Sequence, residues 1–284
     1  MTRKVTIANL QTRPMPDFYS ALNEAISLMD KAIASGADLI CLPEYCGGLK
    51  TDGAAFAPPH LPESEHPVIN GLCDYAAKHS VDILIGSVAV SGSGPKFNNR
   101  SFYVDRSGEI LSRYDKIFLF DVDLSDTEKY RESDRVEPGN KAIVTTTRFG
   151  RIGHSICYDL RFAQLYRDLA QAGAEILVCP AAFAVPTGKA HWHTLNRARA
   201  IENGAFMISP CAHGLVSGGG ASYGHSLIVN PWGEILSDGG DSPGVTVTTI
   251  DLDLVASTRK RISSLQHDRP YTIQVGELIN RAVE

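Results

Sequence analysis

The sequence lacks the features that mark several large classes of protein. Its 284 residues contain no apolar run near the ~18 residues of a membrane-spanning helix. They contain no run of basic residues, and the net charge of −5 at pH 7 does not favour binding to nucleic acid. The N-terminal stretch MTRKVTIANLQ has neither the apolar length nor the small-residue cleavage site of a signal peptide. We therefore predict no membrane contact, no nucleic-acid partner and no secretory leader.

Cysteine is sparse, and its distribution is informative. The six cysteines are scattered, and none of them forms a C-x-x-C pair. Most lie in or beside apolar runs, where a reduced cysteine behaves as a small hydrophobic residue. This usage predicts reduced thiols in a cytoplasmic protein.

The remaining composition and patterning indicate a globular fold with a large core. Apolar residues make up 43% of the sequence and charged residues 21%. Short apolar runs such as 38–42 (DLICL) and 175–179 (EILVC) alternate with helical stripes such as 67–79. Continuous apolar strands indicate sheets covered on both faces, and interleaved hairpins indicate mixed sheets. We expect an α/β (α+β) fold, a four-layer α-β-β-α sandwich of two mixed sheets. One domain would cover 1–262, followed by a C-terminal tail at 263–284.

Polar or glycine-rich segments between these elements show no clear period. We predict loops for 46–65, 121–140 and 182–190. Residues 215–220 include three consecutive glycines, but no strand–helix frame surrounds them. A flexible loop is therefore expected there and not a phosphate-binding turn.

Cys157 lies where a strand pattern gives way to a helical one, in the stretch 151–162 (RIGHSICYDLRF). Asp159 can act as the N-cap or first-turn acid of that helix. A cysteine at such a turn lies near unpaired backbone N–H groups and the positive end of a helix dipole, both of which favour the thiolate. A buried structural cysteine is the alternative for this residue considered alone.

Two further polar side chains lie at the ends of apolar strands. Glu44 follows the apolar run 38–42, and Lys116 precedes four bulky apolar residues. Considered singly, they would be a solvated loop acid and a lysine on an edge strand. Since both lie near strand ends, as Cys157 does, one rim of the sandwich could gather all three.

Three motifs in a fixed order carry a resemblance to a known family. They are LPEY at 42–45, YDKIFLFD at 114–121 and GHSICYDLRF at 153–162. With them, the sequence resembles the nitrilase superfamily of carbon–nitrogen hydrolases over nearly its whole length. The superfamily has the α-β-β-α sandwich expected above. Ala163-Gln164 replaces the pair Pro-Glu that is common in relatives, and Asp115 and Phe118 also depart from the usual pattern.

The resemblance implies roles for individual residues. It places the catalytic glutamate, lysine and cysteine on Glu44, Lys116 and Cys157, and a second glutamate of the site on Glu132. The implied substrate and oxyanion contacts are Tyr158, Arg161, Phe183 and Thr187. A thioester on the cysteine would split amide hydrolysis into two easier steps. Such a mechanism requires no metal and no organic cofactor.

The motifs resemble most closely the branch that contains ω-amidase and deaminated-glutathione amidase. This branch implies a small-molecule amide substrate, the terminal amide of a small carboxylic acid, with release of ammonia. An N-carbamoyl amino acid amidohydrolase or a nitrilase on the same fold remains an alternative. The resemblance also implies a homodimer or a larger assembly, with apolar residues of the tail, among them Leu278, in the interface.

Three readings from other classes are also open. A Cys–His enzyme would need a histidine partner, and His154 is the nearest in sequence, but on a strand it should face away from Cys157. His191 and His193 could suggest zinc, but helical residues two apart do not share a face. A non-catalytic binding protein on the same fold is the third.

Overall fold

The computed structural model describes residues 3–276, apart from residues 54, 93, 124 and 126–128. Two six-stranded sheets form the centre of the molecule. The described residues include no helix that is long and apolar enough to cross a membrane.

The first sheet has the strand order β18-β1-β2-β5-β6-β7. Strands β1, β2 and β5 are parallel, whereas β18, β6 and β7 pair antiparallel with their neighbours. The strand bounds are β18 Gly244–Asp251, β1 Lys4–Gln11, β2 Leu39–Cys41, β5 Asp82–Ser91, β6 Phe97–Val104 and β7 Ile110–Asp115.

The second sheet has the order β10-β11-β12-β13-β16-β17 and repeats this plan. Strands β11, β12 and β13 are parallel, and the outer strands are antiparallel. The bounds are β10 Val144–Thr146, β11 Arg151–His154, β12 Ile176–Val178, β13 Phe206–Ser209, β16 Leu227–Val229 and β17 Ile235–Asp238. Both sheets are mixed, as the sequence predicts.

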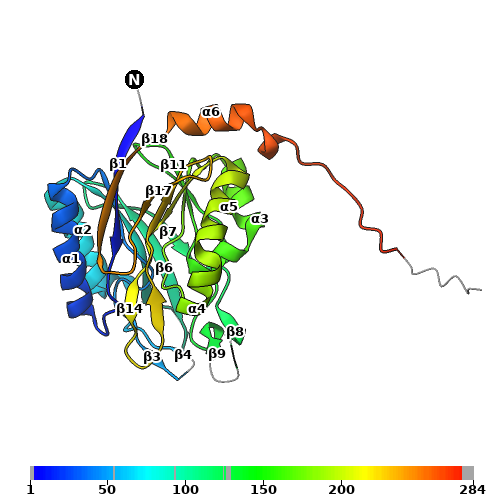
Figure 1. Cartoon of the computed structure of the whole chain (residues 1–284). Helices are drawn as coiled ribbons and strands as arrows, with labels where there is room; N and C mark the ends of the chain where they lie inside the picture. Colours follow the sequence, from blue (N-terminus) through cyan, green and yellow to red (C-terminus); the bar gives the residue numbers. More distant parts are fainter. Residues whose placement is uncertain (1–2, 54, 93, 124, 126–128, 277–284) are drawn as a thin grey trace, which may run out of the picture.

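Helices cover the outer face of each sheet. Helices α1 (Phe18–Ala34) and α2 (Pro67–His79) pack on the first sheet, and α3 (Ala163–Gln171) and α5 (His193–Asn203) pack on the second. The four layers are visible in Figure 1. The bounds of α2 are the predicted ones, because a proline at its first position and a left-handed Ser80 at its end limit the helix. The predicted four-layer sandwich is confirmed.

The two sheets face one another across a core of their own. The side chains between them come from alternate positions of both sheets, as expected for strands with period two. Most of this core is branched aliphatic, and its buried members include Ile7, Leu39, Leu84, Ile152, Ile176, Val178, Phe206, Ile208 and Ile228. Helix α6 (Asp253–Arg261) and the extended residues 267–276 follow β18.

Three of the four segments predicted as loops contain short strands or helical turns, whereas 216–220 is a loop between two short strands, as predicted. Strands and helices of two to five residues are too short to show a period, so the sequence pattern missed them. They gather at the lower end of the molecule in Figure 1. They are β3 Thr51–Asp52 with β4 Ala55–Phe56, β8 Asp121–Asp123 with β9 Lys129–Arg131, α4 Val185–Thr187 with a π-helical turn at Gly188–Trp192, and β14 His213–Leu215 with β15 Ala221–Tyr223.

Candidate active site

The rim at the carboxyl ends of the parallel strands gathers the predicted site residues. Glu44 follows β2 and Lys116 follows β7 in the first sheet, whereas Cys157 follows β11 in the second. The chain that carries Glu44 crosses β5 at Gly86, where a Cβ atom would lie 1.9 Å from the Leu42 carbonyl oxygen. Only a residue without a side chain allows this approach, which brings the Glu44 carboxylate to the interface between the sheets.

Lys116 lies between two carboxylates inside the protein. Its Nζ lies 3.0 Å from Oε1 of Glu44 and 2.8 Å from Oε2 of Glu132, and all three residues are at most 4% exposed. Burial lowers the pKa of Lys116, but the charges of Glu132 and Glu44 outweigh burial and raise it well above its usual value. The ammonium is therefore charged without contact with bulk water.

Further donors fix both carboxylates. The Asn99 side chain donates to Oε1 of Glu44 at 2.9 Å and to Oε1 of Glu132 at 3.3 Å. The backbone N–H of Ala182, from the second sheet, donates to Oε2 of Glu44 at 2.8 Å. The Phe120 N–H donates to Oε2 of Glu132 at 2.6 Å. Sequence reasoning missed Asn99, because nothing in its local pattern distinguishes it from other polar residues of β6.

Cys157 occupies a strained turn. Its φ of 48° lies in the left-handed region, which is uncommon for a residue with a side chain. The sequence predicts a helix starting within two residues of Cys157. Instead, a 3₁₀ turn covers Cys157–Arg161 and α3 begins only at Ala163. The dipole of α3 therefore does not start at the thiol.

Asp159 holds this turn against the strand that leads to Lys116. Its carboxylate accepts hydrogen bonds from the Ile156 N–H at 2.8 Å, the Phe118 N–H at 2.9 Å and the Tyr114 hydroxyl at 2.6 Å. The bond from the Ile156 N–H is the one expected of an acid in the first turn, as the sequence predicts for Asp159. The other two join the turn of Cys157 to the segment of Lys116, a role that local sequence does not reveal.

The features of the turn that were expected to favour the thiolate of Cys157 are outweighed in the structure. Burial, followed by the negative charge of Glu44, raises the pKa of Cys157 well above its usual value, although Lys116 acts in the opposite direction. Because α3 starts six residues later, its dipole does not offset these effects. Cys157 therefore rests as a thiol, and a base must remove its proton before it can attack.

A narrow cavity opens above these groups. Glu44, Lys116, Cys157, Tyr158, Phe183 and Thr187 line it, together with Phe56, Phe120, Ala182 and Ala184. Phe56 and Phe120 were not predicted, since their role depends on the β3–β4 hairpin and on the loop before β8. Glu132 lies behind Lys116, fully buried, and does not line the cavity.

Arg161 lies beside the cavity and not in its lining. Its guanidinium carbon is 5.7 Å from the centre of the Tyr158 ring and 5.6 Å from that of Phe183. Its nearest polar partner among the described residues is Nδ1 of His191, at 3.4 Å.

The histidines do not support a Cys–His enzyme or a zinc site at His191 and His193. His154 is buried, and burial lowers its pKa to about 4. Its Nε2 pairs with Oγ1 of Thr145 at 2.8 Å, and no described histidine lines the cavity with Cys157. His191 contacts Arg161, whereas His193 contacts Asp238, so these two side chains do face different ways.

An α-β-β-α sandwich whose cavity holds a thiol, a buried lysine and a carboxylate has the parts of a hydrolase with a covalent intermediate. The sequence profile of the carbon-nitrogen hydrolase family matches residues 4–260, and the chain belongs to this family within the nitrilase superfamily. The protein is therefore a hydrolase of carbon–nitrogen bonds other than peptide bonds.

Curated relatives include two kinds of amidase. Deaminated glutathione amidase of Synechocystis sp. is 38% identical over 92% of this chain and 96% of its own length. Human omega-amidase NIT2 is 32% identical over 87% of this chain and 89% of its own.

Solved structures share the fold. The C. elegans NitFhit protein superposes with a TM-score of 0.86 at 27% identity, covering 94% of this chain and 66% of that protein. Saccharomyces cerevisiae Nit3 gives a TM-score of 0.77 at 26% identity, covering 91% of this chain and 94% of its own.

Proposed function

We propose that this hydrolase cleaves the terminal amide of a small carboxylic acid through a thioester on Cys157, releasing ammonia. The observation that carries the proposal is one narrow cavity that is lined by Cys157, Lys116 and Glu44 together. The names of the two kinds of relative support the substrate class, since both act as amidases.

In the first step, Glu44 takes the proton of the Cys157 thiol as sulfur attacks the amide carbon. A C–S bond forms, and the carbonyl electron pair moves to oxygen. Lys116 and the backbone N–H of Tyr158 stabilise this oxyanion, an effect worth about 3 kcal/mol for each donor. The raised pKa of Cys157 makes Glu44 necessary as the base.

In the second step, the intermediate collapses and the C–N bond breaks. Glu44 returns its proton to the leaving nitrogen, which departs as ammonia. Glu44 then takes a proton from water, whose oxygen attacks the thioester carbon. The C–S bond breaks, the acid leaves, and Glu44 returns the proton to the Cys157 sulfur. Glu132 acts through Lys116, which it holds charged and in place.

A substrate panel tests the reaction. Ammonia release is measured with α-ketoglutaramate, deaminated glutathione, succinamate, a simple nitrile and an N-carbamoyl amino acid. We expect turnover of the ω-amides. Turnover of the nitrile alone, or of the N-carbamoyl compound alone, would favour the alternative branches. In parallel, iodoacetamide labelling of Cys157, located by peptide mapping, should slow when an amide substrate is present.

The substrate acid needs a cation away from the scissile bond. We propose that Arg161 supplies it, with Thr187 and Phe183 forming the neighbouring wall. The competing role for Arg161 is to pair with Asp159 or a neighbouring loop acid and hold the turn. However, the hydrogen bonds found for the Asp159 carboxylate come from Ile156, Phe118 and Tyr114. A guanidinium–carboxylate pair contributes about 1.5–3 kcal/mol.

Arg161→Lys should therefore lower kcat/KM for an acidic amide roughly 10–100-fold, because lysine cannot form the two parallel bonds. Turnover of neutral propionamide should change little. Equal losses on both substrates would show that Arg161 supports the turn and does not bind the substrate.

We further propose that a cytoplasmic homodimer is the working form, with one domain over 1–262 and the tail at the interface. The exposed apolar side chains of Tyr271, Ile273 and Val275 on an extended segment support this proposal. Leu278, which the prediction also included, lies outside the described residues. Light scattering at micromolar concentration tests it, and a monodisperse species of about 31 kDa would refute it.

A further inference from the structure

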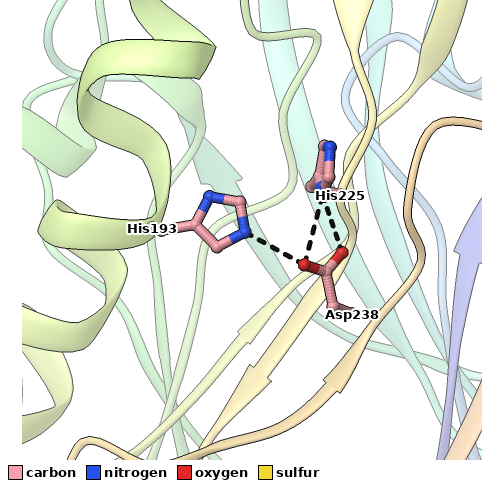
Figure 2. Close-up of side chains that lie close together, drawn as sticks. All are labelled: His193, His225 and Asp238. Atoms are coloured by element: carbon pink, nitrogen blue, oxygen red, sulfur yellow. Dashed lines mark hydrogen bonds and ion pairs between the residues drawn. The ribbon is translucent and has the colours of Figure 1, made fainter.

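Three side chains from distant parts of the sequence meet outside the Cys157 cavity. His193 opens α5, His225 precedes β16 and Asp238 ends β17. Figure 2 shows both imidazoles directed at the Asp238 carboxylate. Nε2 of His193 lies 3.0 Å from Oδ2 of Asp238, and Nδ1 of His225 lies 2.9 Å from Oδ1. One ligand atom from each residue lies within 4.8 Å of the other two.

The surrounding structure holds His225 and Asp238 in place. His225 adopts a left-handed φ of 54°, a conformation that is uncommon for a residue with a side chain. The Trp192 indole N–H donates to the His225 carbonyl at 2.8 Å, and the ring of Tyr223 stacks on His225 at 4.5 Å. The Gly240 N–H donates to Oδ1 of Asp238 at 2.9 Å. The orientation of these ligands is therefore set before any ion binds.

We propose that His193, His225 and Asp238 bind a divalent transition-metal ion such as Zn²⁺. Two imidazoles and one carboxylate form a donor set that suits this ion. Bonds of about 2.0–2.2 Å in a tetrahedral site separate ligand atoms by about 3.3 Å. The two contacts with Asp238 therefore need to open slightly, and ligand atoms up to 4.8 Å apart need to move closer by at most about 1.5 Å. The three side chains are 25–34% exposed, which leaves an entry path and room for a water ligand. The prediction of no metal followed from the proposed thioester chemistry and from the spacing of His191 and His193. His225 and Asp238 did not enter it, because they are distant in sequence.

The site would connect to the wall of the cavity. Trp192, next to His193, packs on the cavity residue Phe183 with ring centres 4.9 Å apart. The π-helical turn that ends at Trp192 follows directly from Thr187, and its Gly188 packs against the ring of Tyr223. A bound ion would therefore tie α5 to β17 and stiffen the segment that carries Phe183 and Thr187.

Metal binding is measured without recourse to activity. Untagged protein, with and without Cys157→Ala, is titrated with Zn²⁺ by calorimetry and with Co²⁺ by absorption spectroscopy. The Cys157→Ala background removes the active-site thiol as a competing ligand. We expect one ion per chain in both, a Co²⁺ spectrum of four- or five-coordinate geometry, and a Tm increase of roughly 3–6 °C at saturating Zn²⁺.

Matched variants locate the site. His193→Gln, His225→Gln and Asp238→Asn should each weaken Zn²⁺ binding at least roughly 10–100-fold, by the usual effect of losing a partner at a metal site. His60→Gln, which removes an exposed histidine elsewhere, should leave it unchanged. Near-UV circular dichroism checks that each variant is folded.

Several results would overturn the proposal. One is the absence of saturable binding, which would mean that the cluster is only a hydrogen-bonded His–Asp–His group. A second is binding that survives in all three variants, and a third is binding that disappears with Cys157→Ala alone. Neither the proposal nor its test depends on the amidase reaction.

Discussion

Charged side chains join the two sheets at both rims of the sandwich, but the rims bury them differently. At the rim of Cys157, Lys116 and Glu44 come from the first sheet, and Glu44 accepts from Ala182 of the second. At the opposite rim, Arg148 of the β10–β11 turn pairs with Asp82 of β5, and Arg3 before β1 pairs with Glu175 before β12. Lys116 is almost fully buried, whereas the side chains of Arg148 and Arg3 are 38% and 41% exposed.

The difference in exposure between Lys116 and the two arginines has consequences for stability and for chemistry. Water can solvate an exposed guanidinium when its partner is removed, so a surface pair contributes little to stability. A buried ion has no such substitute, and removing its partner leaves an uncompensated charge. The buried rim therefore keeps a cation in fixed geometry and in a dry environment. In the proposed mechanism this cation stabilises the oxyanion, which a hydrated lysine would do far less well. The opposite rim only fastens the sheets together.

Removing the buried cation Lys116 should have the largest effect on stability and on catalysis. Lys116→Met leaves Glu44 and Glu132 close together without a cation, and it removes the proposed oxyanion donor. We expect the free energy of unfolding to fall by about 3–5 kcal/mol and kcat/KM to fall at least roughly 10²–10³-fold. Urea denaturation and ammonia release measure the two effects.

A double variant separates stability from catalysis. Lys116→Met with Glu132→Gln removes one carboxylate along with the cation, so part of the lost stability should return while activity stays low. If Lys116→Met were as stable as the parent protein, the negative charges of Glu44 and Glu132 would not need Lys116 to balance them.

The sequence could predict those features of the fold and the site that follow from local patterns. The strands, the long helices and the four layers follow local patterns, since burial of one face imposes a period of 2 or 3.6 residues. Glu44, Lys116 and Cys157 could be located because each lies in a motif next to an apolar strand. The bounds of α2 came out as predicted because a proline and a left-handed residue limit it.

What the sequence could not predict depends on contacts between distant segments. Asn99 bridges two carboxylates that lie 55 and 33 residues from it, and His193 meets Asp238 across 45 residues. The expectation that the turn of Cys157 favours its thiolate failed for a related reason. Its pKa depends on burial and on Glu44, which reaches it from the other sheet, and not on its own turn.

At the opposite rim, Arg148→Met should have an intermediate effect on stability and none on catalysis. Asp82 is buried, and its carboxylate also accepts from the Tyr103 hydroxyl at 2.8 Å. Losing the Arg148 partner leaves part of a buried charge unsatisfied, which costs about 1–3 kcal/mol. Thermal or urea unfolding measures this cost. A change in kcat/KM beyond about twofold, outside ordinary surface effects, would show that the two rims are coupled.

The smallest effect is expected for Arg3→Gln. The guanidinium of Arg3 pairs with Glu175 through two bonds of 2.7 and 2.8 Å, and the two side chains are 41% and 20% exposed. We expect a loss of less than about 1 kcal/mol at neutral pH, and a smaller loss at high salt because exposed charges are screened. Arg13→Gln is a matched control, since Arg13 pairs with Glu24 in the same two-bond manner without joining the sheets.

The pH dependence of stability tests whether the Arg3–Glu175 pair causes the stability loss in Arg3→Gln. The hydrogen bond from Arg3 is the main effect that lowers the pKa of Glu175 below its usual value of 4.5. The unfolded chain then binds a proton more readily than the folded protein does. The contribution to stability is therefore fully present above the unfolded pKa, and it is lost as the pH falls through the lowered folded-state pKa. Urea midpoints of the parent protein and Arg3→Gln should thus differ at pH 7 and converge in acid. Arg3→Gln could lower the free energy of unfolding clearly more than Arg13→Gln does at pH 7. In that case, an ion pair that joins the two sheets stabilises the protein more than an exposed pair within one sheet and its helix.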